Sequence, residues 1–169
     1  MLNVIGSHYT YAEVPFGFWL QDFFNLGRNH YDRIVHFSFG FLFAYPIREI
    51  FMRIAKTKGI WALWTPIELV LGLGAIYEIL EWWITLVVGG DLGIAYLGSQ
   101  GDVWDAQWDM FLAGTGSFIA MGIVLLVLLI YKKREYITEL KNSLKISSKP
   151  LGEKALEKIK RKSSNLKHK

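Results

Sequence analysis

The sequence predicts an all-α protein: a multi-pass transmembrane bundle of three helices, with an N-terminal interfacial helix and a basic C-terminal tail. Of the 169 residues, 52% are hydrophobic and only 20% are charged, which is too apolar for an ordinary soluble domain. Residues 110–131 contain no charged side chain and are long enough to cross a bilayer. Residues 132–169 carry 13 Lys and Arg against 4 Asp and Glu, whereas residues 1–131 carry 6 against 11.

The composition also excludes several other classes of protein. Intrinsic disorder of the whole chain is excluded because 15% of the residues are aromatic. A disulfide scaffold and a cysteine zinc site are excluded because the chain has no cysteine. An acidic, apolar body followed by a basic tail is typical of a membrane protein whose tail lies in the cytoplasm.

The first expected element is an interfacial helix at about residues 15–26. Its apolar side chains recur at helical spacing beside the polar Gln21 and Asp22; they are Phe16, Trp19, Leu20, Phe23 and Phe24. This pattern fits a short helix that lies on the membrane surface.

Three membrane helices are expected next, at about residues 34–54, 60–88 and 107–131. In the first, Arg48 and Arg53 can reach the headgroup region and so extend a short uncharged run, and Glu49 can pair with Arg53. The second contains acidic residues but is long enough to cross, and tryptophans lie near both of its ends, as in interface belts. The third is followed at once by residues 132–134, Lys-Lys-Arg, which form a stop-transfer flank.

Basic residues predict the orientation. The connection between the first two membrane helices carries Arg53, Lys56 and Lys58, and the basic tail follows the third helix, so both are expected in the cytoplasm. The connection at residues 89–101 contains Asp91 and no Lys or Arg, and is therefore expected outside. The expected location is the cell (inner) membrane.

The tail at residues 132–169 has two interpretations. It is either a solvated, partly disordered extension or a segment attracted to anionic lipids, to which each basic residue near the surface adds about 1 kcal/mol. Besides the lipid bilayer, anionic lipids are therefore its expected partner. Nucleic-acid binding is not expected, because the tail has one aromatic residue and no folded platform on which bases could stack.

Several ionisable residues are expected at one depth. About 20 residues cross the hydrocarbon core, and counting that length from Lys132, Gly59 and Ala55 leads to Leu112, Ile79 and Val35. The ionisable residues beside those three points are Asp109 on the third helix, Glu78 and Glu81 on the second, and Asp32 and His36 on the first. A polar cluster is therefore expected at the outer face.

The spacing of the acidic residues indicates that they face the bundle interior. Asp32 and His36 share a helix face at i,i+4, Glu78 and Glu81 share one at i,i+3, and Asp102, Asp105 and Asp109 form a single stripe. That stripe continues through Ala113, Gly116 and Ala120, small residues that allow helices to approach closely. Ser99, three residues before Asp102, resembles a capping box that would start the third helix there.

So many acidic groups cannot all remain ionised and unpaired at a membrane interface. A bound cation could neutralise them, Arg28 and Arg33 could pair with them, or some could be protonated. Oxygen ligands with one histidine suit Mg²⁺, Mn²⁺ or Zn²⁺. The candidate metal ligands are Asp32, His36, Glu81, Asp102, Asp105 and Asp109, with Glu78 as the candidate catalytic base. The alternative is that these charges only hold the helices together.

Three segments resemble the YjdF-like family of bacterial inner-membrane proteins, a domain of unknown function: HYTYAEVPFGFWLQDFF, RNHYDRIVHF and GSQGDVWDAQWDMF. The likeness covers about residues 5–131. It implies a multi-pass membrane protein, and that this chain lacks the further helices that usually precede the first segment in the family. The three acidic groups are also distantly similar to the VanZ-like membrane proteins, a likeness of fold alone.

Three functions remain open at this stage. The first is metal-dependent hydrolysis or transfer on a lipid or lipid-linked phosphate. The second is non-enzymatic binding of an envelope ligand, or a structural role, in which the carboxylates would hold a cationic group. The third is a cation- or proton-coupled transporter component, for which three helices are few unless the chain forms a homo-oligomer.

Overall fold

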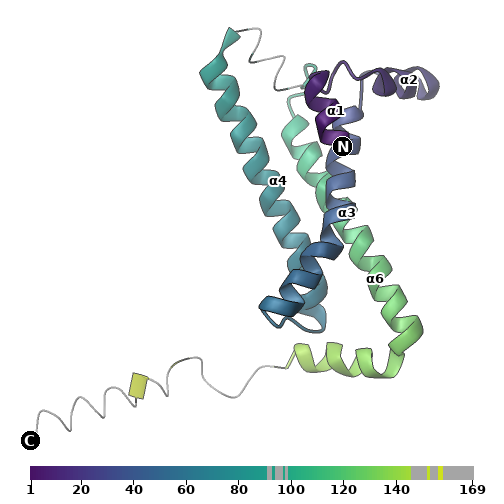
Figure 1. Ribbon diagram of the computed structural model, residues 1–169, viewed down its shortest axis with the longest axis vertical. Coiled ribbons are helices and arrows are strands. Elements are labelled where there is room, and N and C mark those ends of the chain that lie inside the picture. Colours follow the sequence, from purple (N-terminus) through teal and green to yellow (C-terminus); the bar gives the residue numbers. More distant parts are fainter. Residues whose placement is uncertain (91–92, 94–96, 98, 146–151, 153–155, 158–169) are drawn as a thin grey trace, which may run out of the picture.

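The computed structural model describes residues 1–90, 93, 97, 99–145, 152 and 156–157. Within these residues it contains five helices and no strand (Figure 1). In chain order they are α1 (Leu2–His8), α2 (Pro15–Phe24), α3 (Tyr31–Ile54), α4 (Ile60–Val88) and α6 (Asp105–Ser143). The predicted all-α class is therefore confirmed. Asp91 and most of the predicted lipid-binding tail after Lys145 lie outside the described residues.

Helices α3, α4 and α6 are each long and apolar enough to cross a membrane, as the sequence predicts. α3 and α6 start at the same end of the bundle and run in the same direction, whereas α4 runs the opposite way (Figure 1). Large apolar side chains are exposed on their outward faces, among them Ile76, Phe118 and Leu126. So much exposed apolar surface fits a lipid environment and not water.

Close backbone contact joins α3 to α6. A Cβ atom added to Gly40 would collide with the carbonyl group of Ala113, and one added to Gly116 would collide with the carbonyl oxygen of Phe37. Ala113, Gly116 and Ala120 are all buried. The predicted small-residue stripe therefore faces α3, which is the arrangement that lets two membrane helices pack tightly.

Helix α6 is longer than the expected 107–131, because it continues across a kink at Lys132 to Ser143. Beyond the kink it turns back under the connection between α3 and α4 (Figure 1). Glu139 accepts a hydrogen bond from the backbone N–H of Gly59 at 2.8 Å, and the Ser143 hydroxyl accepts one from that of Ile60 at 3.1 Å. These acceptors satisfy backbone donors that the start of α4 would otherwise leave free. We call this arrangement the clamp.

The two N-terminal helices lie at the end of the bundle opposite the clamp (Figure 1). α1 lies beside the start of α3, where the Tyr31 hydroxyl donates a hydrogen bond to the carbonyl of Leu2 at 2.9 Å. α2 projects sideways and carries an exposed stack of Phe16, Trp19 and Phe23. It ends at Phe24 because Asn25 adopts a left-handed conformation, with φ of 52°.

Candidate metal site between α3, α4 and α6

The α3–α6 contact positions the site. Gly40 packs against Ala113, and one helical turn nearer the start of each helix these positions are taken by His36 and Asp109. A further turn brings Asp32 on α3, and Asp105 lies one turn before Asp109 on α6. Residues small enough for backbone contact thus give way to ionisable residues at the end we call the acidic end.

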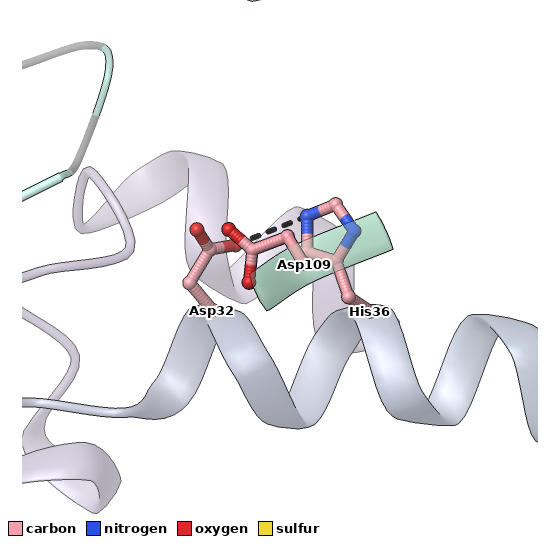
Figure 2. Close-up of side chains that lie close together, drawn as sticks. All are labelled: Asp32, His36 and Asp109. Carbon is pink, nitrogen blue, oxygen red and sulfur yellow. Dashed lines mark ion pairs between the residues drawn. The ribbon is translucent and has the colours of Figure 1, made fainter. Parts of the chain in front are cut away.

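Asp32, His36 and Asp109 form the centre of the acidic end (Figure 2). Each offers one ligand atom, and the three atoms lie within 4.8 Å of one another. His36 Nε2 lies 3.5 Å from Asp32 Oδ1. All three side chains are buried, with Asp109 only 2% exposed. This spacing suits one metal ion or one shared proton between the groups.

Helix α4 adds two glutamates to the acidic end. Glu78 Oε1 lies 3.8 Å from His36 Nε2, on the same imidazole nitrogen that faces Asp32. Glu81 is also buried. Within the described residues, neither Glu78 Oε1 nor Asp109 Oδ1 has a hydrogen-bond partner, although both atoms are buried. A buried carboxylate oxygen without a partner is costly, so these two oxygens favour a bound ion or proton.

Two arginines form the rim of the acidic end. Arg28 lies 2.7 Å from Asp105 Oδ1 and 3.4 Å from Asp102 Oδ2, and Arg33 lies 2.6 Å from Asp102 Oδ2. The Arg33 guanidinium also sits over the ring of Trp108, 5.3 Å from its centroid. Asp102 and Asp105 are therefore paired with arginine, while Asp32 and Asp109 have no arginine partner among these ion pairs.

The rim also perturbs two groups that lie outside the membrane-spanning helices. The backbone N–H of Trp104, which donates to Asp102 Oδ1 at 3.0 Å, and the two guanidinium groups lower the pKa of Asp102 below its usual value. Burial lowers the pKa of His30, and the nearby charges of Arg33 and Arg28 lower it further. Asp102 is thus held ionised and His30 neutral near pH 7.

The predicted capping box at Ser99 is wrong. Asp102 does not begin the helix, since α6 starts at Asp105 after a turn in which the Asp102 carboxylate binds the N–H of Trp104. The Ser99 side chain does not cap α6. The backbone carbonyl of Ser99 accepts a hydrogen bond from Arg28 at 2.9 Å. Local spacing suggested the cap, but the arginines supply a stronger, charge-assisted interaction for the same loop.

Sequence reasoning missed Asn29, which ties the N-terminal segment to the site. Asn29 is 1% exposed, and its side-chain amide donates to the carbonyl groups of Ala12 and Val14, while its Oδ1 accepts from the N–H of Tyr31. Its backbone exchanges two hydrogen bonds with the side-chain amide of Gln100. Asn29 lies inside the motif RNHYDRIVHF, and Gln100 lies inside the motif GSQGDVWDAQWDMF. Their position in these two motifs was the signal that could have identified them.

Of the predicted metal ligands, the structure brings Asp32, His36 and Asp109 into one ligand-sized group, with the predicted base Glu78 beside them. The other three, Glu81, Asp102 and Asp105, lie around this group, and the two aspartates are bound to arginine. Two carboxylates and an imidazole are donors that suit Mn²⁺ or Zn²⁺, and Mg²⁺ when water completes the shell. The unpartnered oxygen of Asp109 is the feature that fits such an ion.

Three apolar spanning helices around a buried acidic and imidazole cluster define a multi-pass membrane protein. Residues 1–133 match the family model DUF2238, described as "Predicted membrane protein", and the chain therefore belongs to that family. It is 40% identical over 118 residues to "Inner membrane protein YjdF" of Escherichia coli (strain K12), which confirms the predicted resemblance. That match covers 69% of this chain and 56% of the relative, so the chain spans little more than half the relative's length. No solved structure matches the chain.

Proposed function

We propose that the acidic end binds a divalent cation and hydrolyses or transfers a lipid or lipid-linked phosphate at the outer surface of the membrane. The observation that supports this most strongly is the buried group of Asp32, His36 and Asp109, with an unpartnered oxygen on Asp109. Intramembrane ionisable residues are rare and mark function by default. The lipid phosphate fits because the group lies on helices that phospholipids surround.

The charge balance makes a cation necessary for this chemistry. Six carboxyl groups lie at the acidic end, on Asp32, Glu78, Glu81, Asp102, Asp105 and Asp109, and two guanidinium groups, on Arg28 and Arg33, accompany them. A phosphate anion would be repelled by that excess of acidic groups. When bound, a divalent cation would polarise a phosphoryl oxygen and offset part of the local negative charge.

Glu78 is the base in this proposal. Its unpartnered Oε1 can accept the proton of the attacking water or alcohol, whose oxygen forms the new bond to phosphorus. The bond from phosphorus to the leaving oxygen breaks, and the proton passes from Glu78 to that oxygen. His36 Nε2 lies 3.8 Å from Glu78 Oε1 and 3.5 Å from Asp32 Oδ1, so one imidazole nitrogen faces both carboxylates.

Phosphate release from phosphatidic acid in nanodiscs tests this function, with Mg²⁺, Mn²⁺ or Zn²⁺ added in turn. We expect metal-dependent release, and a loss of about 10²–10⁴-fold in rate for Glu78→Gln, which is the usual contribution of a general base. Asp22→Asn, on the exposed face of α2, is the matched control and should keep full activity. Equal rates in the presence of metal and of a chelator would contradict the proposal.

A second candidate is a non-enzymatic binder of a cationic group, and the excess of carboxylates over arginines favours it specifically. Binding of a polyamine such as spermidine, measured by calorimetry with and without Mn²⁺, separates the two. Spermidine binding that Mn²⁺ does not weaken, together with no phosphate release, would favour the binder over the enzyme.

The orientation forms part of the same proposal. The relative's name, "Inner membrane protein", and the basic residues at the clamp support an inner-membrane location with the clamp and tail in the cytoplasm. Because the chain has no cysteine, single cysteines can test it. Val103→Cys, at the acidic end, should react with an impermeant maleimide from outside, and Lys141→Cys should react only after the membrane is opened. The reverse pattern would contradict the outward placement.

A further inference from the structure

A cavity of about 620 Å³ lies between α1, α3 and α4, directly beside the group of Asp32, His36 and Asp109. Its lining includes His36, Ser38, Phe39, Leu42, Leu73 and Tyr77. The volume lies within the range of about 300–1,000 Å³ that is usual for pockets that bind small molecules. His36 belongs both to this cavity and to the group of Asp32, His36 and Asp109, so the two adjoin at its imidazole ring.

The cavity changes from polar to apolar along α3. The polar side chains that α3 and α4 contribute, His36, Ser38 and Tyr77, lie toward the acidic end, and its far end is lined by Leu42 and Phe43. Asn3 and Tyr11 add polar groups from the N-terminal segment. His36 and Phe43 are seven residues apart, which corresponds to about 10 Å along a helix. A ligand that fills this space must therefore have a polar group at one end and an apolar chain behind it.

The apolar end of the cavity is accessible from the lipid. Leu42 is 59% exposed, Phe43 is 52% exposed and Leu73 is 40% exposed, and they come from the two facing helices α3 and α4. A chain from the surrounding bilayer can therefore enter sideways between these helices.

We propose that this cavity holds one acyl chain of a glycerophospholipid whose phosphate group lies at Asp32, His36 and Asp109. The inference rests on the proposed function and identifies its substrate as a lipid bound by both headgroup and chain. Apolar burial alone gives no preference within a bilayer, since lipid tails are as apolar as the cavity wall. Selective occupancy therefore comes from the headgroup contact at one end and the fitted chain at the other.

Photo-crosslinking tests the proposal. The full chain in nanodiscs is exposed to phosphatidic acid that carries a diazirine in one acyl chain, and the labelled peptides are mapped by mass spectrometry. We expect labels on the lining segments of α3 and α4 around Phe39, Leu42 and Leu73. Labels spread evenly over outward-facing positions, such as Ile76 and Phe118, would overturn the proposal.

Ser38→Phe fills the cavity and should abolish labelling of the lining segments. Thr115→Phe is the matched control, because it also replaces a half-buried hydroxyl residue of a membrane helix but lies outside the cavity. If Ser38→Phe does not fold, Leu73→Trp fills the same space from α4. Unchanged labelling in a folded cavity-filling variant would also overturn the proposal.

Mn²⁺ binding, measured on the same variants, separates this inference from the proposed function. If a cavity-filling variant loses the labels on the lining segments but still binds Mn²⁺, the result supports the cavity as the site of the acyl chain. Intact Mn²⁺ binding with no lining labels in the unmodified chain would refute the chain site and leave the metal site in place. Lining labels without any Mn²⁺ binding would refute the proposed function and with it the headgroup half of this inference.

Discussion

The two ends of the bundle use polar groups in opposite ways. At the clamp, Glu139 and Ser143 satisfy the backbone of Gly59 and Ile60, and Trp61 donates its ring N–H to the carbonyl of Ser143. At the acidic end, carboxylates and an imidazole converge while buried oxygens of Glu78 and Asp109 have no hydrogen-bond partner among the described residues.

This difference supports the proposal that the acidic end binds a ligand and that the clamp stabilises the fold. Hydrogen bonds that are already paired within the chain stabilise the fold but offer nothing to a ligand. Convergent carboxylate oxygens without hydrogen-bond partners cost stability, and such groups persist at functional sites. The clamp end also has a buried charge, Arg48, whose Nε has no hydrogen-bond partner among the described residues, but that cation has a carboxylate neighbour in Glu49 at 3.6 Å.

The largest loss of stability is expected from a change at the contact between α3 and α6, because both ends of the bundle depend on it. Gly40→Val places side-chain atoms against the backbone of Ala113, so α3 and α6 must separate. We expect a loss of about 3 kcal/mol or more in the free energy of unfolding in micelles, at the upper end of overpacking effects, and loss of both ends together. Gly122→Val, which has open space around it, is the control. Equal stability of the two variants would show that the contact does not hold the bundle.

A smaller effect should be confined to the clamp. Gly59 has φ of +57°, and a Cβ there would collide with Ser143, so Gly59→Ala should destabilise the protein by about 1–3 kcal/mol. Gly89→Ala has the same backbone strain without a collision, since Gly89 has φ of +66° and open surroundings. Thermal unfolding should therefore rank Gly59→Ala below Gly89→Ala, with Mn²⁺ binding retained in both. Loss of Mn²⁺ binding in Gly59→Ala would show that the two ends are coupled.

The smallest effect concerns pH and the rim of the acidic end. The folded pKa of Asp102 is lowered, so its stabilising contribution is present above the usual value of 3.8 and is lost as the pH falls through the folded pKa. Asp102→Asn should therefore make stability less dependent on pH on the acid side. Protonation of His30 should destabilise the fold at a higher pH than protonation of Asp102 does. Its lowered pKa means that the unfolded chain takes up this proton first as the pH falls below 6.5. Unfolding midpoints measured between pH 3 and 7 would reveal both changes, and identical curves for Asp102→Asn and the unmodified chain would contradict the role of the rim.

The sequence predicts the membrane helices and the convergence of the acidic residues because both follow from local periodicity. The stripe of Ala113, Gly116 and Ala120 also identifies the face of α6 that meets α3, and Asp109 lies on the same face. Spacing alone could not predict which acids pair with arginine. Arg28 lies 77 residues from Asp105, and no periodic pattern links a loop to a helix over that distance.

The clamp could not be predicted for the same reason. Ser143 lies 83 residues from Ile60, and the basic residues around the kink at Lys132 predict the start of a tail that is either solvated or attracted to anionic lipids. Helix α6 nevertheless continues, because Tyr136 is buried in the same apolar cluster as Leu63 and Met121. Tertiary packing therefore overrides the charge pattern in this segment.

The central claim is that the acidic end binds a divalent cation through Asp109, and Mn²⁺ binding tests it most directly. Titration of the purified full chain, followed by electron paramagnetic resonance, should show one bound ion. Asp109→Asn should weaken binding by more than about tenfold, since even a residue that only supports a metal ligand has an effect of that size. Asp22→Asn, at an exposed site on α2, should bind as tightly as the unmodified chain. Equal affinity in Asp109→Asn, or no bound Mn²⁺ in any sample, would contradict the account.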